Sequence, residues 1–171
     1  MLIATQNPIE LEGTFPLPEA QLDRFLLKAK LGYPSPQEER DVLSRFQVSN
    51  PLEDLASIVE IPELSALQGI HRQVFVEESI RDYVVRVNRA TREHPDIKLG
   101  TSTRAALGLQ AASQAMAGIQ GRGFVIPDDV KTLAPSVLSH RIVLKTQALL
   151  RGRAEEDIIE EILSTVPVPA E

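Results

Sequence analysis

The sequence contains no cysteine among its 171 residues. This absence excludes disulfide bonds, thiolate metal sites and cysteine nucleophiles, and it fits a reducing cytoplasm. Tryptophan is also absent, and only 4% of the residues are aromatic. The core must therefore be built from Leu, Ile, Val and Ala, which favours packed helices over a β-sandwich or a barrel.

Positive charge is scarce in the chain. The sequence has 18 Lys and Arg against 24 Asp and Glu, and no dense basic block. Nucleic-acid binding by the whole surface is disfavoured, because it requires positive charge that releases counterions. No apolar stretch approaches the roughly 20 residues of a membrane span, and the apolar residues after Met1 lack the pattern of a signal peptide. We therefore expect a cytoplasmic protein.

A phosphate-binding loop is missing as well. No G-x-x-x-x-G-K-[ST] motif occurs in the sequence, and no strand that ends in a pair of magnesium-binding acids precedes Asn7. The glycines between Gly118 and Gly123 lack the lysine of that motif and do not follow a strand, so we interpret them as a helix terminator. The usual means of gripping a triphosphate is thus absent.

Residues 1–47 have the pattern of part of an α/β domain. The apolar runs 2–5 and 25–31 predict two strands. Pro18 stands where a short helix could begin, and Ser35 is the predicted cap of a further helix that ends near Phe46.

From residue 48 onwards the pattern is helical. Apolar residues recur at spacings of three and four, as on one face of an amphipathic helix. They predict helices over about 64–71, 80–94, 102–119, 127–138 and 155–163, with a short extended pair within 141–150. The predicted fold class is therefore mainly α, with a remnant of an α/β domain at 1–47 and a helical domain at 48–171.

Three polar residues are candidates for a functional site, and each has a simpler alternative. Asn7 ends a predicted strand, where it could hold a water molecule or a phosphate oxygen, but Asn also suits a turn before Pro8. Arg24 could project towards a neighbouring subunit or form a local ion pair with Asp23. Arg104 lies in the first turn of a predicted helix, where a cation is unfavourable unless a phosphate or a nearby acid offsets it.

Other polar residues give no sign of a metal site. The three histidines are far apart in the sequence, and none shares a ligand spacing with a carboxylate. Asp128 and Asp129 are acids in the first turn of a helix, where the helix dipole favours them. We therefore predict no metal ligands in this chain.

Several sequence blocks, taken together, resemble one family. They are ATQNP at 4–8, EGTFPLPEAQLDRF at 12–25, GYP at 32–34, ATREHP at 90–95, LGTSTRA at 99–105 and FVIPDDVK at 124–131. The chain is similar through nearly its whole length to the C-terminal portion of MoxR-type AAA+ ATPases. The resemblance implies a truncated remnant of a P-loop core followed by a helical lid domain.

The resemblance also implies roles for the three candidates. Asn7 corresponds to sensor 1, which orients the attacking water, Arg24 to the arginine finger, and Arg104 to the sensor-2 arginine of the lid. Thr103 departs from the family pattern, which usually has Pro at this position to pre-set the first helical turn. Family members carry the phosphate loop and the magnesium-binding acids upstream of the segment that matches Asn7.

The full protein implied by the resemblance binds ATP and Mg²⁺. It is a ring-forming, chaperone-like ATPase that remodels or matures other proteins, often with partners that contain a von Willebrand factor A domain. The present chain is predicted neither to bind ATP tightly nor to hydrolyse it. The alternative is a non-enzymatic helical interaction module in which Asn7, Arg24 and Arg104 are idle.

In AAA+ proteins the strands that correspond to residues 2–5 and 25–31 are separated by an earlier strand. Without it, both would have unpaired backbone edges. We therefore expect residues 1–47 to be rearranged or exchanged between chains, while the helical domain folds normally.

Overall fold

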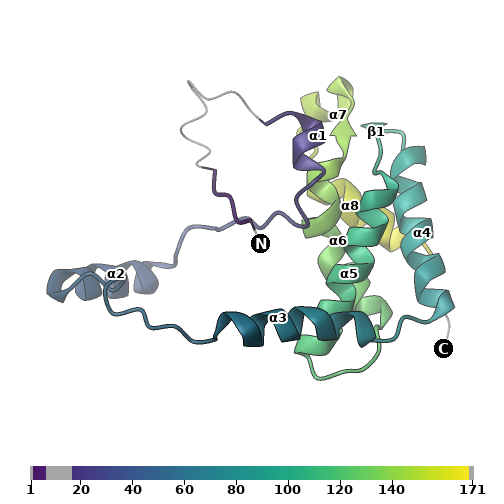
Figure 1. Ribbon diagram of the computed structural model, residues 1–171. Coiled ribbons are helices and arrows are strands. Elements are labelled where there is room, and N and C mark those ends of the chain that lie inside the picture. Colours follow the sequence, from purple (N-terminus) through teal and green to yellow (C-terminus); the bar gives the residue numbers. More distant parts are fainter. Residues whose placement is uncertain (1, 7–16, 170–171) are drawn as a thin grey trace.

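The computed structural model describes residues 2–6 and 17–169. Its body is a bundle of α4 (Glu78–Glu93), α5 (Thr103–Ile119), α6 (Pro127–Leu138) and α8 (Glu155–Thr165), shown in Figure 1. Shorter elements accompany the bundle: α1 (Glu19–Leu22), η2 (His71–Gln73), η3 (Ser139–Arg141) and α7 (Thr146–Leu150). The predicted mainly α fold class is confirmed.

The core of the body is formed by the apolar faces that the sequence pattern predicts. Tyr83 of α4, Leu109 of α5, Leu138 of α6 and Ile158 of α8 are completely buried. The four helices agree with the predicted ones to within a few residues, which is the usual scatter at helix ends. None of the described helices has the length and apolar character needed to cross a membrane.

A small antiparallel sheet lies beside the helices. It consists of β1 (Ile97–Leu99) and β2 (Val143–Leu144), with Ile97 opposite Leu144. The extended pair predicted within residues 141–150 is therefore wrong in its pairing. Only Val143–Leu144 is a strand, and it pairs with β1, whereas the following residues form α7.

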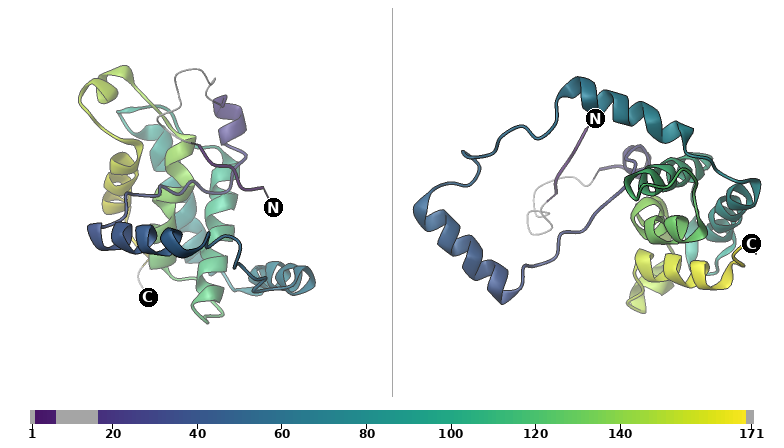
Figure 2. Two further views of the ribbon diagram at one scale, coloured as in Figure 1. Left: turned by 90° about the vertical axis from the view of Figure 1, so that its left-hand side faces the viewer. Right: turned by 90° about the horizontal axis from the view of Figure 1, so that it is seen from below.

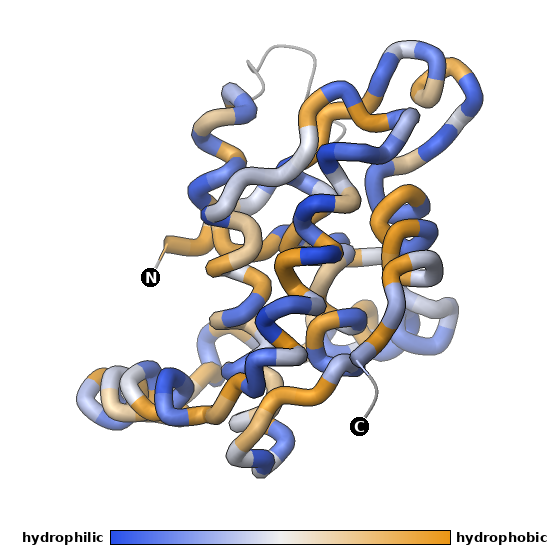
Figure 3. Tube along the Cα trace, turned by 90° about the vertical axis from the view of Figure 1, so that its right-hand side faces the viewer, coloured by the Kyte–Doolittle hydropathy of each residue, from blue (hydrophilic) through white to orange (hydrophobic). Residues whose placement is uncertain are grey.

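The two strands predicted at residues 2–5 and 25–31 do not form. Residues 2–6 are an exposed apolar segment, orange beside the N label in Figure 3, with Leu2 78% exposed. A strand needs a neighbour for its backbone N–H and C=O groups, and the described residues provide none for either segment. Lys28 N–H instead donates to Ser136 O on the helical body, at 2.8 Å. Among the described residues these two segments thus take part in no sheet, and the rearrangement or exchange of residues 1–47 stays a prediction.

Residues 31–70 form a segment that we call the arm, which contains α2 (Pro36–Val48) and α3 (Ile61–Ile70). The predicted Ser35 cap forms: Glu38 N–H donates to Ser35 Oγ at 3.3 Å, and Ser35 N–H donates to Glu38 Oε2 at 2.7 Å. Neither arm helix has a buried residue. In Figure 1, α2 stands apart from the body, and Figure 2 shows the arm as a wide loop.

Candidate functional site

The N-terminus of α5 carries Arg104, one of the three predicted site residues. Ser102 holds the N-cap position, but its hydroxyl donates to Asp23 Oδ1 at 3.3 Å instead of capping the helix. Arg104 Nη1 lies 3.8 Å from Asp23 Oδ2. A carboxylate beside a helix N-terminus is favoured by the helix dipole, so Asp23 supplies the anion that offsets Arg104.

Arg24 follows Asp23 directly in the chain and is exposed. The local ion pair between Asp23 and Arg24, considered as an alternative from the sequence, is not formed. The Asp23 carboxylate faces Arg104 and Arg141 instead. Across residues 2–6 and 17–169, no ion pair involves the Arg24 side chain.

Arg141, on η3, is the main residue of this region that the sequence did not reveal. Its side chain is only 2% exposed, and its Nε lies 3.3 Å from Asp23 Oδ1. Burial lowers the pKa of the Arg141 guanidinium below its ordinary value, and the Asp23 carboxylate opposes that shift. A buried cation is tolerated only with such partners. We call Asp23, Ser102, Arg104 and Arg141 the Asp23 junction.

His140 adds a second contact to the same segment. Its Nε2 lies 3.2 Å from Phe25 O, so the ring donates a hydrogen bond there. Burial lowers the pKa of His140, and the positive charges of Arg141 and Lys28 add to that effect. The imidazole is therefore neutral at pH 7.

A buried polar network fixes the loop that precedes Arg104. The Thr101 hydroxyl lies 2.8 Å from the Thr91 hydroxyl and 2.6 Å from the side-chain amide of Asn88. Arg92 Nε donates to Thr101 O at 2.9 Å. Because Asn88, Thr91 and Arg92 belong to α4, these bonds hold the start of α5 against that helix.

Comparison with known proteins places both halves of this region in one family. Residues 89–162 match the profile described as AAA lid domain, and residues 1–27 match the profile described as ATPase family associated with various cellular activities (AAA). The uncharacterized protein YeaC of Bacillus subtilis is 46% identical over 99% of this chain and 53% of its own length. Chaperone MoxR1 of Mycobacterium tuberculosis is 45% identical over 99% of this chain and 47% of its own.

A solved structure agrees with these relatives. A crystal structure of a predicted ATPase from Cytophaga hutchinsonii matches with a TM-score of 0.88 and 36% identity, over 96% of this chain and 53% of that one. The chain belongs to the MoxR-type AAA+ ATPases. It corresponds to the C-terminal portion of that family and spans about half the length of the curated relatives it matches.

The MoxR family match gives the Asp23 junction a place in the larger architecture. The AAA match contains Asp23 and Arg24, and the lid match contains Arg104 and Arg141. The junction therefore links residues of the AAA match to residues of the AAA lid match. Asn7, the predicted sensor 1 of the MoxR family, lies outside the described residues.

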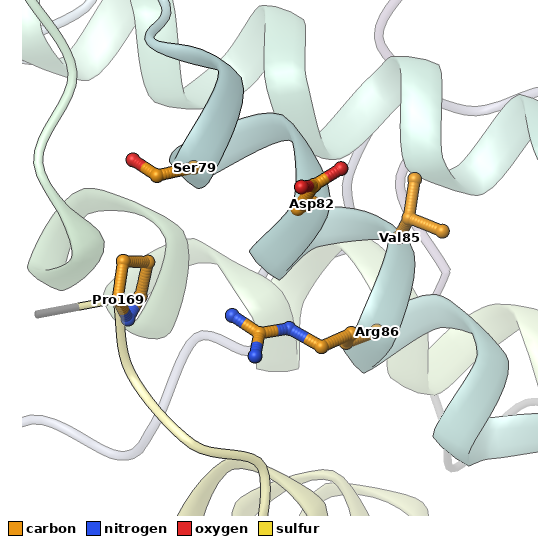
Figure 4. Close-up of a pocket in the computed structure, with 5 residues that line it drawn as sticks. All are labelled: Ser79, Asp82, Val85, Arg86 and Pro169. Atoms are coloured by element: carbon orange, nitrogen blue, oxygen red, sulfur yellow. The ribbon is translucent and has the colours of Figure 1, made fainter.

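A surface hollow of about 410 Å³ lies elsewhere, on the face of α4. Figure 4 shows its lining, with the Arg86 guanidinium extending from α4 towards Pro169; the lining residues are Ser79, Asp82, Val85, Arg86 and Pro169. None of them is a predicted site residue. Within the described part of the chain, no His, Asp and Glu side chains gather in a group of three that could hold a metal ion. The Asp23 junction is therefore the candidate site.

Proposed function

We propose that this chain is part of a ring-forming ATPase that uses ATP binding and hydrolysis to remodel or mature other proteins. The observation that carries the proposal is the Asp23 junction, where one carboxylate links the segment that bears Arg24 to the helix that bears Arg104. Two cations suited to phosphate are thus held in one region of a family of ATPases. The name chaperone MoxR1, borne by one relative, supports the chaperone-like part.

In this proposal, ATP lies between two subunits of the ring. Arg24 reaches the nucleotide of the adjacent subunit and neutralises charge that develops during phosphoryl transfer, a role worth about 10³–10⁵ in rate. Arg104 reads the γ-phosphate from the lid, and Asn7 orients the attacking water. Because Asp23 contacts Arg104 and precedes Arg24 in the chain, we assign both arginines to the same subunit interface.

The cofactors of the complete protein are ATP and Mg²⁺. When bound, Mg²⁺ would neutralise part of the charge of the phosphates. Arg24 and Arg104 suit phosphate, since a guanidinium presents several donors to an anion. The 171 residues contain no Walker A motif, however. The present chain is therefore expected neither to bind ATP tightly nor to turn it over.

We assign residues 1–47 to the end of the core and residues 48–171 to the lid. The arm crosses this boundary, and we assign it to the contact surface between the core and the lid. The apolar side chains of the arm support this, since Leu43 is 72% and Phe46 58% exposed. Large exposed apolar groups in a row are typical of a contact surface. The Cytophaga hutchinsonii structure is about twice as long and still matches over 96% of this chain. We therefore propose that the arm packs on the α/β core of the complete ATPase.

The partners and location follow from the same proposal. Ring assembly with other copies, association with partners that contain a von Willebrand factor A domain, and a cytoplasmic location are all expected of the complete protein. Its client protein would be recognised by surfaces that act together with the nucleotide-driven motion of the lid.

The proposal is tested with a longer version that carries a family phosphate-binding loop and its acidic strand ahead of residue 1. Arg24→Ala should reduce kcat by about 10³ or more. Arg81→Ala, at an exposed arginine of α4, is the matched control and should leave kcat unchanged. Mixing Arg24→Ala subunits with subunits that lack the phosphate-loop lysine should restore activity, because some interfaces then combine an intact finger with an intact loop.

The non-enzymatic interaction module remains the second candidate, favoured by the exposed apolar arm. It predicts that the longer version has no ATPase activity, or that its activity is the same with Arg24→Ala. It would also be supported if Phe46→Glu abolished binding to a protein partner and the ATPase variants had no effect on that binding.

A further inference from the structure

The segment that carries Arg24 has little structure of its own. Among the described residues before it, the four-residue helix α1 is the only helix or strand, and residues 27–33 are neither helix nor strand. The direction in which Arg24 points must therefore be set by contacts with something else. Those contacts come from the lid, and most come from a single side chain.

Arg141 holds this segment through its backbone. Nη1 donates to Leu26 O at 3.2 Å, Nη2 donates to Phe25 O, and Nε lies 3.4 Å from Asp23 O. The same guanidinium is also tied to the last turn of α6, since Nη1 donates to Val137 O at 2.5 Å. The carbonyls on both sides of Arg24 are thus bonded to one buried, rigid fork of donors.

Neighbouring residues complete the attachment. His140 donates to Phe25 O at 3.2 Å, and Lys28 N–H donates to Ser136 O at 2.8 Å. A Cβ atom on Gly108 of α5 would be in ordinary van der Waals contact with Leu26 Cδ1 at 3.5 Å and with Arg141 Nη1 at 3.6 Å, so both groups lie close against α5. The attachment runs from residue 23 to residue 28 along the end of α6 and η3.

We propose that Arg141 is a positioning residue for the arginine finger, which it fixes to the lid so that Arg24 moves as α6 and η3 move. This inference rests on the proposed role of Arg24. An arginine is needed because a planar fork reaches several carbonyls and one carboxylate together, whereas the ammonium group of lysine is a point charge on a flexible stem.

The attachment itself can be measured in the present chain by hydrogen exchange. The reporter is the Lys28 amide, whose N–H is bonded to the lid, and the internal reference is the amides of α5 and α6. In Arg141→Gln we expect the Lys28 amide to exchange about tenfold faster or more, with the reference amides unchanged. Arg122→Gln is the matched control. Arg122 also pairs with an acid of the lid, Asp129 at 2.5 Å, but none of its hydrogen bonds in the described structure reaches residues 23–28.

Arg141→Lys keeps the positive charge in place, and it is the second variant for the exchange measurement if Arg141→Gln fails to fold. It should still release the Lys28 amide, because lysine cannot bond several carbonyls at once. An unchanged Lys28 amide in a folded Arg141 variant overturns the proposal, and so does equal acceleration in Arg122→Gln.

The catalytic consequence is read separately in the longer version that carries a phosphate-binding loop. Arg141→Lys should lower kcat at least tenfold with little change in KM, and it should add little to the loss caused by Arg24→Ala. If Arg24→Ala itself leaves kcat unchanged, the proposed function of Arg24 fails while the exchange result still reports on the attachment. If Arg24→Ala lowers kcat and Arg141→Lys does not, the positioning role is wrong.

Discussion

Gly100 lies directly against the backbone of Arg92. A Cβ atom built on Gly100 would be 2.7 Å from Cα of Arg92, a distance that side chains do not tolerate. The close approach brings the Thr101 carbonyl within 2.9 Å of Arg92 Nε. The lack of a side chain at residue 100 therefore lets the loop that leads to α5 and Arg104 pack against α4.

Gly100→Ala should lower the free energy of unfolding by about 1–3 kcal/mol, because the methyl group forces either α4 or the loop to shift. Urea denaturation measures this change. Gly32→Ala is the control: a Cβ there meets nothing within 4 Å, so we expect a change below about 0.5 kcal/mol. Equal stability of the two variants would show that the loop adapts freely.

The charge of Asp23 should contribute to stability, because its carboxylate is the partner of the buried Arg141 guanidinium. Removing one member of a fully buried pair costs 3–5 kcal/mol, but Asp23 is 28% exposed. We therefore expect Asp23→Asn to lower the free energy of unfolding by about 1–3 kcal/mol.

Asp82→Asn provides the control for this experiment. Asp82 is an exposed acid of α4, and its substitution should change stability by less than about 0.5 kcal/mol. If Asp23→Asn has no larger effect than Asp82→Asn, the backbone carbonyls alone satisfy Arg141.

The helices of the body could be predicted from the sequence because each buries one face at helical spacing. Val84, Val87 and Thr91 of α4 are buried at such spacings. The strand expected over 25–31 is not found, because its apolar pattern alone does not decide whether a strand forms. An apolar run shows that burial is favoured, but a strand also needs a partner ladder, and Lys28 bonds the lid instead.

The candidate site was predicted only in part. Arg24 and Arg104 were found through their family blocks, whereas Arg141 was not. Its partners are backbone carbonyls more than 110 residues earlier in the chain, and carbonyls leave no trace in residue identity. The position of Arg141 in the chain could have been a signal. It closely follows Val137 and Leu138, which α6 buries, so a buried side chain could have been expected there.

Stability should depend on pH through His140. Its folded-state pKa is lowered, mainly by burial, so the unfolded chain, with a pKa near 6.5, takes up the proton first as the pH falls. His140 should therefore leave the free energy of unfolding unchanged above pH 6.5. Below pH 6.5 it should lower the free energy of unfolding, by at most about 1.4 kcal/mol per pH unit.

Urea denaturation at pH 7.5 and 5.5 measures this slope, and His140→Gln should reduce it. The carboxylates whose pKa values are lowered, Glu38, Glu156 and Glu161, lose their contribution only below their ordinary value of 4.5, outside this window. His71→Gln, at a histidine beside the arm, is the control substitution. A slope that is the same in wild type and His140→Gln would contradict the prediction.

The arm should contribute almost nothing to the stability of the present chain. Leu43 on α2 is 72% exposed and Leu109 on α5 is completely buried, so the same substitution compares the two environments. Leu109→Ala should lower the free energy of unfolding by about 2–5 kcal/mol, and Leu43→Ala by less than about 0.5 kcal/mol. In a longer version that includes the α/β core, Leu43→Ala should become clearly destabilising, because the arm then has a surface to cover. If Leu43→Ala costs the same in both versions, the arm does not pack on the core.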